Sequence, residues 1–232
     1  MGPPPLALDP SRFVALHHPL EARTPTYGDA PGVVITPRKL IRRGEPSNSH
    51  LVSMPLHAGT HVDLPRHFSD EQPTLSEIGA AEWLFTRPLL VDLPRGELGV
   101  IEPRDFTPHA APLRECDFLA VRTGFSSQRF TEAFRKRGPA MTGACARFLL
   151  DAAPRLRAVA TDGVSGASPA RPEDAIEWHR VMLGTKRGDR YVFLLEDVNL
   201  APWRDDFAAV LVVPLAVKDA DGVPCSVFGV PR

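Results

Sequence analysis

The sequence predicts a single mixed α/β domain. Short apolar runs of strand length recur along the chain, and amphipathic helical patterns lie between several of them in its second half. The length of 232 residues suits one large domain, and 43% hydrophobic residues provide for a sizeable core. The 25 prolines are spread along the whole chain, which indicates many turns and rigid loops between short elements.

The expected strands are rich in valine, leucine and phenylalanine and are short enough to lie buried between layers. They cover residues 88–92, 116–122, 158–161, 191–195 and 207–217. The first half of the chain is more typical of hairpins and loops. Strands and helices therefore alternate only in the second half.

Two helices are expected among these strands. Residues 142–153 place apolar side chains on one face and stop at Pro154, whereas residues 174–183 follow a proline and begin with acidic residues. No linker or internal repeat divides the chain. We therefore expect residues 13–232 to form one domain and residues 1–12 to form a flexible N-terminal tail.

The composition argues against several classes of function. The net charge of −1 and a pI near 6.7 give no excess of positive charge for binding nucleic acid or an anionic membrane. We expect the basic cluster at residues 38–43 to be the solvated side of a strand or turn. No apolar run approaches the length of a membrane span and no signal peptide is recognisable, so a cytoplasmic protein is expected. Three distant cysteines without CxxC spacing indicate small core residues: Cys116, Cys145 and Cys225.

The densest group of potential metal ligands lies in residues 57–67. Four of its side chains share one parity: His57, His61, Asp63 and His67. Gly59 and Pro65 oppose a helix, whereas alternate side chains of an extended chain project to the same side. We therefore expect an extended segment with a kink at Pro65. Its ligand side chains would line one wall, and Gly59 would keep that wall open for an ion. A surface loop with solvated histidines is the alternative, but this density of ligands favours a metal site.

Two other places can carry chemistry. Glu196 and Asp197 directly follow the apolar run 191–195, where a buried charge is costly unless it is paired or bound to metal. For Asp197 a solvated turn is the preferred interpretation. His179 lies in a helical pattern, and its spacing alone is more typical of a surface or capping residue.

The chain resembles the cyclase family, which includes bacterial kynurenine formamidases and isatin hydrolases. Residues 57–67 match the family signature HxGTHxDxPxH at every fixed position. Further segments that resemble the family follow in family order at residues 24–29, 161–165, 177–183 and 194–200. The resemblance implies a single-domain swivelling β/β/α fold, in agreement with the mixed α/β prediction.

The resemblance also implies a site with two divalent ions. One ion would be held by His57, His61, Asp63 and Glu196. The other would be held by His179, with Asp63 and Glu196 as bridging carboxylates. His67 would be the acid/base, and Tyr27 matches the aromatic residue that stacks on the substrate. Zinc is the expected ion and manganese is the alternative.

The implied activity is metal-dependent hydrolysis of an amide bond. The reaction would be that of an arylformamidase, which converts N-formylkynurenine to kynurenine and formate in tryptophan catabolism, or of a related cyclic-amide hydrolase. A metal-activated hydroxide would attack the carbonyl, and His67 would pass a proton to the departing nitrogen. Two alternatives stay open: a metal-dependent cyclase or dehydratase of a biosynthetic intermediate, and a non-catalytic metal-binding protein. The expected partners are a small molecule, such as an aryl amide, and further copies of the chain in a homodimer or homotetramer.

Overall fold

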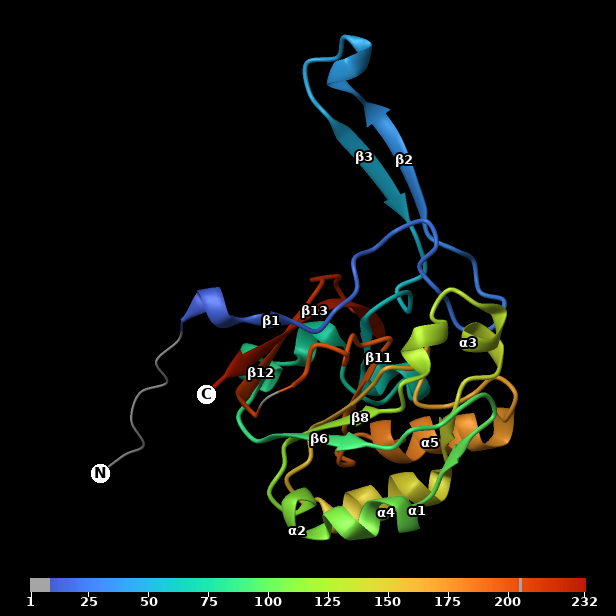
Figure 1. Cartoon of the computed structure of the whole chain (residues 1–232), viewed down its shortest axis with the longest axis vertical. Coiled ribbons are helices and arrows are strands. Elements are labelled where there is room, and N and C mark those ends of the chain that lie inside the picture. The colour runs from blue at the N-terminus through green and yellow to red at the C-terminus, as the bar shows by residue number, and fades with distance from the viewer. Residues whose placement is uncertain (1–8, 205) are drawn as a thin grey trace.

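A nine-stranded mixed sheet forms the framework of the protein (Figure 1). The computed structural model describes residues 9–204 and 206–232. Within that part of the chain the strands follow the order β5-β12-β13-β4-β11-β10-β8-β6, and β1 pairs with β13. Their bounds are β1 Val14–Ala15, β4 His61–Asp63, β5 Leu84–Phe85, β6 Pro88–Asp92, β8 Phe118–Arg122, β10 Ala158–Thr161, β11 Phe193–Glu196, β12 Phe207–Pro214 and β13 Gly222–Pro231.

The sheet divides into a parallel half and an antiparallel half. Strands β6, β8, β10 and β11 run parallel to one another, whereas β4, β13, β12 and β5 pair antiparallel, and β4 also pairs antiparallel with β11. The parallel strands are covered on both faces, which explains why they are almost continuously apolar in the sequence. Strand β4 joins the two halves, because it lies between β11 and β13.

Two helices cover one face of the parallel half: α4 Gly143–Ala152 and α5 Pro172–Leu183. Alternate strand residues such as Leu119 and Val159 pack into the core cluster with these helices, whereas their neighbours Phe118 and Ala158 pack into a second cluster. This division follows from the alternation of side chains along a strand. The Thr142 side chain caps α4 by accepting a hydrogen bond from the backbone N–H of Cys145.

Shorter elements complete the described part of the chain. The short α-helices are α1 Pro103–Phe106, α2 Ala110–Leu113 and α3 Glu132–Lys136, and β7 Val100–Ile101 pairs with β9 Ala140–Met141. Turns of 3₁₀ helix occur at Pro10–Arg12, Ile41–Arg43, Pro65–Phe68, Leu75–Glu77, Ala80–Trp83, Thr107–His109 and Phe125–Gln128. No helix of the described residues is long and apolar enough to cross a membrane.

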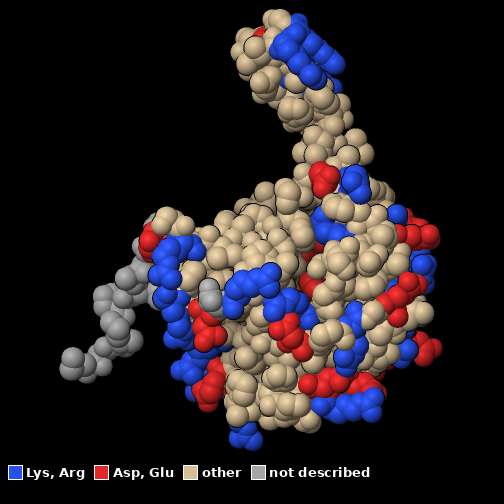
Figure 2. Space-filling view, in the orientation of Figure 1, with Lys and Arg blue, Asp and Glu red and all other residues tan. Residues whose placement is uncertain are grey.

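A β-hairpin projects from the body of the protein (Figure 1). It consists of β2 Val34–Lys39 and β3 Ser49–Ser53, and all six residues of β2 are exposed. The basic cluster of residues 38–43 gathers at its tip (Figure 2), as the sequence predicts. The hairpin also exposes apolar side chains: Val34, Ile35, Leu51 and Val52.

The predicted elements of the second half are confirmed. All five predicted strands form, as do both helices, and the strand at Ala158–Thr161 has the predicted ends. The three cysteines are buried and free. Most of the expected N-terminal tail lies outside the described residues, since these begin at residue 9, and Pro10–Arg12 forms a 3₁₀ turn.

Candidate metal centre

Strand β4 places two potential ligands on one face of the sheet. His61 pairs with Glu196 of β11, and Asp63 lies two residues further along β4. Val62, between them, packs into the core on the opposite side. The prediction that alternate side chains share one side is therefore confirmed for this strand. Pairing of β4 with β11 brings Glu196 beside His61.

The expectation of one extended wall through residues 57–67 is wrong outside β4. Gly59 adopts a left-handed conformation with φ of +65°, and Pro65–Phe68 forms a 3₁₀ turn. A Cβ on Gly59 would lie 2.9 Å from the Thr24 side chain. Glycine is needed there for a turn and for close packing, and not to keep a wall open. His57 and His67 instead reach the site from the two ends of β4.

Helix α5 brings His179 to the carboxylates of Asp63 and Glu196. Its Nε2 lies 3.6 Å from Oδ2 of Asp63 and 3.6 Å from Oε1 of Glu196. Nε2 of His61 lies 3.3 Å from Oδ1 of Asp63 and 3.5 Å from Oε2 of Glu196. All four side chains are buried. Two imidazoles and two carboxylates therefore converge in the protein interior.

The backbone contacts of the two buried imidazoles show that this cluster fits a cation. Nδ1 of His61 donates to the carbonyl of Gly59 at 2.8 Å, and Nδ1 of His179 donates to that of Ala175 at 2.6 Å. In a neutral imidazole each Nε2 is then an unprotonated acceptor that faces carboxylate oxygens, which are acceptors too. A cation between them satisfies all of these atoms, and such backbone contacts are typical of metal-bound histidine.

When no ion is bound, protonation of the imidazoles balances the negative charge of the carboxylates. Burial lowers the pKa of His61 and His179, but the neighbouring carboxylates outweigh this effect and raise the pKa of both. Burial also disfavours the charged form of Asp63, yet hydrogen bonds with His57 and His61 hold its pKa well below the usual value. Imidazole nitrogen and carboxylate oxygen are donors that suit zinc and are compatible with manganese.

A loop after β10 orients Glu196. The Ser165 hydroxyl donates to Oε1 of Glu196 at 2.7 Å, and the backbone N–H of Gly166 donates to the same oxygen at 2.9 Å. Spacing in the sequence does not indicate that Ser165 is a partner of Glu196. Its signal was the resemblance of residues 161–165 to a family loop.

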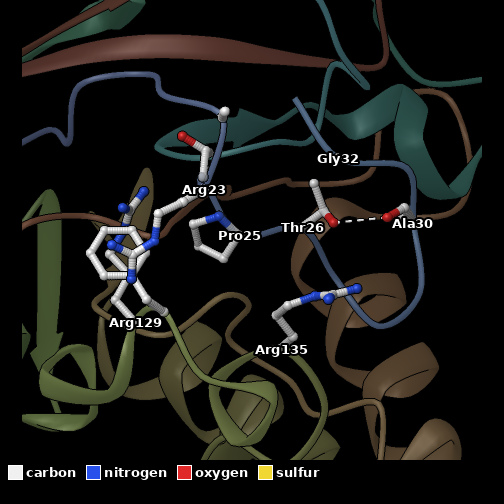
Figure 3. A pocket seen from close by; sticks show the side chains of 10 residues that line it. Arg23, Pro25, Thr26, Ala30, Gly32, Arg129 and Arg135 are labelled. Atoms are coloured by element: carbon white, nitrogen blue, oxygen red, sulfur yellow. Dashed lines mark hydrogen bonds between the residues drawn. The ribbon is translucent and has the colours of Figure 1, made fainter. Parts of the chain in front are cut away.

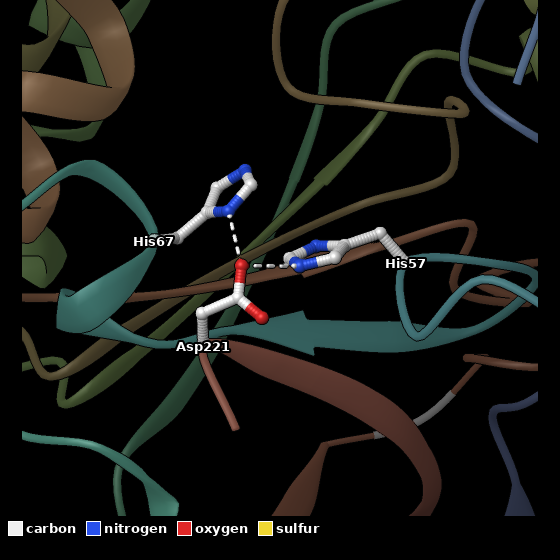
Figure 4. A group of neighbouring side chains, drawn as sticks. All are labelled: His57, His67 and Asp221. Carbon is white, nitrogen blue, oxygen red and sulfur yellow. Dashed lines mark hydrogen bonds and ion pairs between the residues drawn. The ribbon is translucent and has the colours of Figure 1, made fainter. Parts of the chain in front are cut away.

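Asp221, which the sequence analysis missed, links two histidines (Figure 4). Its Oδ2 lies 2.9 Å from Nδ1 of His67 and 3.1 Å from Nε2 of His57, and the two imidazoles stack with centroids 4.1 Å apart. Hydrogen bonds with both histidines lower the pKa of Asp221. Gly222 follows, where a Cβ would collide with the His57 ring. An acidic residue before a strand carries no spacing signal, so only the fold reveals it.

His57 contacts carboxylates through both ring nitrogens. Its Nδ1 lies 2.7 Å from Oδ1 of Asp63, in addition to the contact of Nε2 with Asp221. Burial lowers the pKa of His57, but hydrogen bonds to Asp221 and Asp63 more than offset this and raise it to about 10. Among the described residues, three groups have potential ligand atoms within 4.8 Å of one another: His57, His61 and Asp63; Asp63, His179 and Glu196; His57, His67 and Asp221.

The interpretation of Asp197 as a solvated turn residue is wrong. Its side chain is 2% exposed and forms a bidentate ion pair with Arg129, with Nε–Oδ1 at 2.8 Å and Nη2–Oδ2 at 2.6 Å. The chain turns sharply inward after β11, because Asp197 has a φ of +49° and its N–H donates to the carbonyl of Gly163. Burial raises the pKa of Asp197, and the guanidinium opposes that shift.

All seven site residues predicted from the sequence line one cavity of about 390 Å³: Tyr27, His57, His61, Asp63, His67, His179 and Glu196. Apolar side chains, among them Phe68 and Ile176, form much of the remaining wall. Burial, with the charge of Glu196, raises the pKa of Tyr27 to about 12, so its hydroxyl stays protonated at neutral pH. The cavity thus combines a polar floor with a wall suited to a planar apolar group.

Comparisons with known proteins agree with this architecture. The sequence model of the Cyclase family matches residues 14–167. A kynurenine formamidase from Bacillus cytotoxicus is 25% identical over 173 residues, which cover 75% of each chain. Isatin hydrolase A from Labrenzia aggregata superposes with a TM-score of 0.79 at 20% identity, covering 95% of this chain and 94% of the other. The corresponding protein from Ralstonia solanacearum gives a TM-score of 0.78 at 18% identity, with coverage of 95% and 92%.

Proposed function

The chain belongs to the cyclase family, and from this membership we propose that it is a metal-dependent hydrolase of amide bonds. The observation that carries the proposal is the cluster in which Nε2 of His61 and of His179 faces the carboxylates of Asp63 and Glu196. This cluster lies on the floor of an open cavity, where a substrate can reach it. Kynurenine formamidase and isatin hydrolase, the similar proteins named above, are both hydrolases of carbon–nitrogen bonds by name.

We assign the metal ligands as the sequence resemblance implies. One ion would be held by His57, His61, Asp63 and Glu196, and a second by His179 together with the two carboxylates. Zinc is the proposed ion, with manganese as the alternative. Such an ion supplies Lewis acidity, which polarises a carbonyl group and makes a water molecule more acidic.

The protein's own contribution to the chemistry is proton transfer and positioning. Hydrolysis of an amide adds the oxygen of water to the carbonyl carbon, breaks the C–N bond and delivers a proton to the departing nitrogen. His67 is placed for that delivery, because it lines the cavity and Asp221 occupies its Nδ1, which leaves Nε2 free to take a proton from water and pass it to the nitrogen. Asp221 is a positioning residue, since it acts through His67.

The cavity wall supports an aryl amide as the substrate. Tyr27 and Phe68 offer aromatic surfaces, and Ile176 adds an apolar side chain at the rim, where it is 44% exposed. An aryl formamide such as N-formylkynurenine, or a cyclic aryl amide such as isatin, presents a planar ring beside the bond to be cleaved. Arylformamidase-like activity is therefore the proposed specificity.

The test is a hydrolysis assay with N-formylkynurenine, isatin and formanilide. Release of formate, or of the ring-opened acid, is followed by chromatography with protein as purified, after chelation, and after zinc or manganese is restored. We expect hydrolysis of at least one substrate that chelation abolishes and metal restores. Activity that persists after removal of bound metal would contradict the proposal.

The cyclase or dehydratase alternative gives a different outcome in the same experiment. Loss of water from a hydroxy acid or amide, without incorporation of labelled oxygen from H₂¹⁸O into an acid product, would indicate it. Metal bound in stoichiometric amounts, with neither reaction detected, would instead favour a non-catalytic metal-binding protein.

We also propose that the chain assembles as a homodimer or homotetramer. The projecting hairpin supports this, because it exposes Val34 and Ile35 on one strand and Leu51 and Val52 on the other. A two-stranded hairpin is at best marginally stable alone in water, so contact with a second copy would stabilise it. Its strands connect to Ala30 and Pro55, which both line the cavity, so assembly would also order the rim of the site.

A further inference from the structure

A second cavity, of about 300 Å³, adjoins the candidate metal centre (Figure 3). Both cavities take lining residues from the segment 24–32, and Ala30 lines both of them. Three arginines contribute to this second cavity, namely Arg23, Arg129 and Arg135, and none of its ten lining residues is acidic. We propose that this cavity, hereafter the arginine pocket, binds a small oxyanion such as a carboxylate or phosphate group.

The positive charge of the arginine pocket is only partly neutralised. Asp197 pairs with Nε and Nη2 of Arg129, which leaves Nη1 of that guanidinium without a partner among the described residues. Arg23 forms no ion pair with any described residue, and its guanidinium lies over the Phe130 ring at 4.3 Å. Arg23 and Arg129 therefore both retain donors that have no partner among the described residues.

Two of these positive charges contact the same aromatic ring. The guanidinium carbons of Arg23 and Arg129 lie 4.3 Å and 5.1 Å from the centre of the Phe130 ring. The negative face of the ring attracts each cation but cannot remove the repulsion between them. An anion beside both guanidinium groups would relieve that repulsion.

Arg135 supplies a donor that has no acceptor within the described protein. Its Nη2 donates to the carbonyl of Gly28 at 2.6 Å, which fixes the side chain against the segment Thr24–Gly32. Its Nε is buried and finds no hydrogen-bond partner among the described residues. A buried guanidinium N–H without an acceptor is costly, so a ligand oxygen that reached this donor would be bound favourably.

The chemistry of guanidinium groups selects the ligand class. Planar arrays of N–H donors bind carboxylate and phosphate oxygens through paired, charge-assisted hydrogen bonds. None of the residues that line the arginine pocket is a histidine, aspartate or glutamate, so its lining is distinct from that of the candidate metal centre. This inference does not depend on the proposed amide hydrolysis.

Calorimetric titration of the metal-loaded protein tests the proposal. The probes are sodium phosphate, sulfate, formate and benzoate, each at constant ionic strength with chloride as the reference anion. We expect saturable binding of at least one probe with Kd on the order of 1 mM or lower. Tighter binding of formate or benzoate would identify an organic acid as the ligand, and tighter binding of phosphate or sulfate an inorganic oxyanion.

Two variants locate the bound anion. Arg23→Gln removes a charge without touching any hydrogen bond of the described residues, and Arg135→Gln removes the unpartnered donor. Each should weaken binding at least about tenfold, since charge-assisted bonds are lost. The matched control is Arg38→Gln on the exposed hairpin, which should bind like the wild type.

A crystal soaked in selenate gives an independent readout of position. An anomalous peak between the guanidinium groups is expected in the wild type and should be absent in the Arg23→Gln/Arg135→Gln double variant. Absence of saturable binding by every probe would overturn the proposal. Equal binding by the double variant would also overturn it, because the anion would then occupy the metal centre.

Discussion

Nδ1 of His67 lies 2.9 Å from Oδ2 of Asp221, so the imidazole donates a hydrogen bond to the carboxylate. That bond places the proton of a neutral ring on Nδ1 and leaves Nε2 unprotonated. Carboxylate–imidazole pairs of this kind orient a general acid or base. The same oxygen of Asp221 also lies 3.1 Å from His57, so one carboxylate connects a proposed ligand with the proposed acid/base.

Replacement of His67 by alanine should slow turnover and leave the metal in place. Loss of a general acid or base typically costs about 10²–10⁴-fold in rate, so kcat should fall within that range. Metal content, measured by inductively coupled plasma mass spectrometry, should match the wild type. His50→Ala, an exposed substitution on the hairpin, is the control. A metal-free His67→Ala protein would show that His67 is a ligand.

Asp221→Asn should reduce kcat by about tenfold or more through its effect on His67. An amide can place its NH₂ group toward Nδ1 and so favour the wrong tautomer of the imidazole. KM should change little, because Asp221 does not line the cavity. Asp221→Glu should recover part of kcat. A variant whose KM rises while kcat stays constant would argue against a positioning role.

His179→Ala should lower metal content from about two ions per chain toward one. His179 contributes Nε2 beside the carboxylates of Asp63 and Glu196, and its loss leaves the second ion without its nitrogen ligand. The matched control is His109→Ala, far from the cavity lining. Chelation should also lower Tm of the wild type, because an ion bound only by the folded state stabilises it. Unchanged stoichiometry in His179→Ala would contradict the ligand assignment.

Leu51→Asp should dissociate the proposed oligomer. Leu51 is 56% exposed on the projecting hairpin, so a charge there would disrupt an apolar subunit contact without disturbing the core. Light scattering after gel filtration should shift from a multiple of 25.4 kDa to the monomer mass. Arg42→Gln at the basic tip is the control. A wild type that is already monomeric would refute the proposed assembly.

The sequence predicts most reliably those helices and strands whose signals lie in neighbouring residues. The run at 158–161 forms β10 with the predicted ends, because four consecutive small or β-branched residues suit a strand covered on both faces. Helix α4 begins after its Thr142 cap and ends before Pro154, signals that lie within the segment itself. Local pattern and tertiary structure agree at these positions.

The site itself could be predicted only where a contiguous motif carries it. His61 and Asp63 alternate on β4, as their parity indicates, whereas the role of Gly59 depends on contact with Thr24, more than thirty residues earlier. Asp221, directly before strand β13, approaches His57 and His67, and no spacing within residues 57–67 encodes that contact. Resemblance to a family supplied His179, which spacing alone did not favour.

The solvent exposure of Asp197 cannot be predicted from its position after a strand. Acidic residues that follow an apolar run are often solvated, and the sequence gives no sign that Arg129 lies beside this one. The two residues are 68 positions apart and nearly fully buried, so the pair forms only because the fold brings Arg129 to the end of β11. Long-range pairing of charges is a property of the tertiary fold.

The neighbourhood of this ion pair makes stability depend on pH through His18. Nε2 of His18 is buried without a hydrogen-bond partner among the described residues, 4.0 Å from Oδ1 of Asp197. Burial, together with the positive charge of Arg129 and the neighbouring His17, lowers the pKa of His18 from 6.5 to about 4. The folded state therefore keeps this imidazole neutral at a pH where the unfolded chain protonates it.

The direction of the pH dependence follows from the number of protons that each state binds. Between pH 6.5 and 4 the unfolded state binds more protons at this position, so the free energy of unfolding should fall as pH falls through that window. Partial exposure of the ring screens the effect, and we expect a loss of about 1–2 kcal/mol. His18→Gln should remove this contribution, which urea unfolding at pH 7, 5.5 and 4.5 would measure. His50→Gln on the exposed hairpin should keep the wild-type slope, and an identical slope in His18→Gln would show that His18 is not the responsible group.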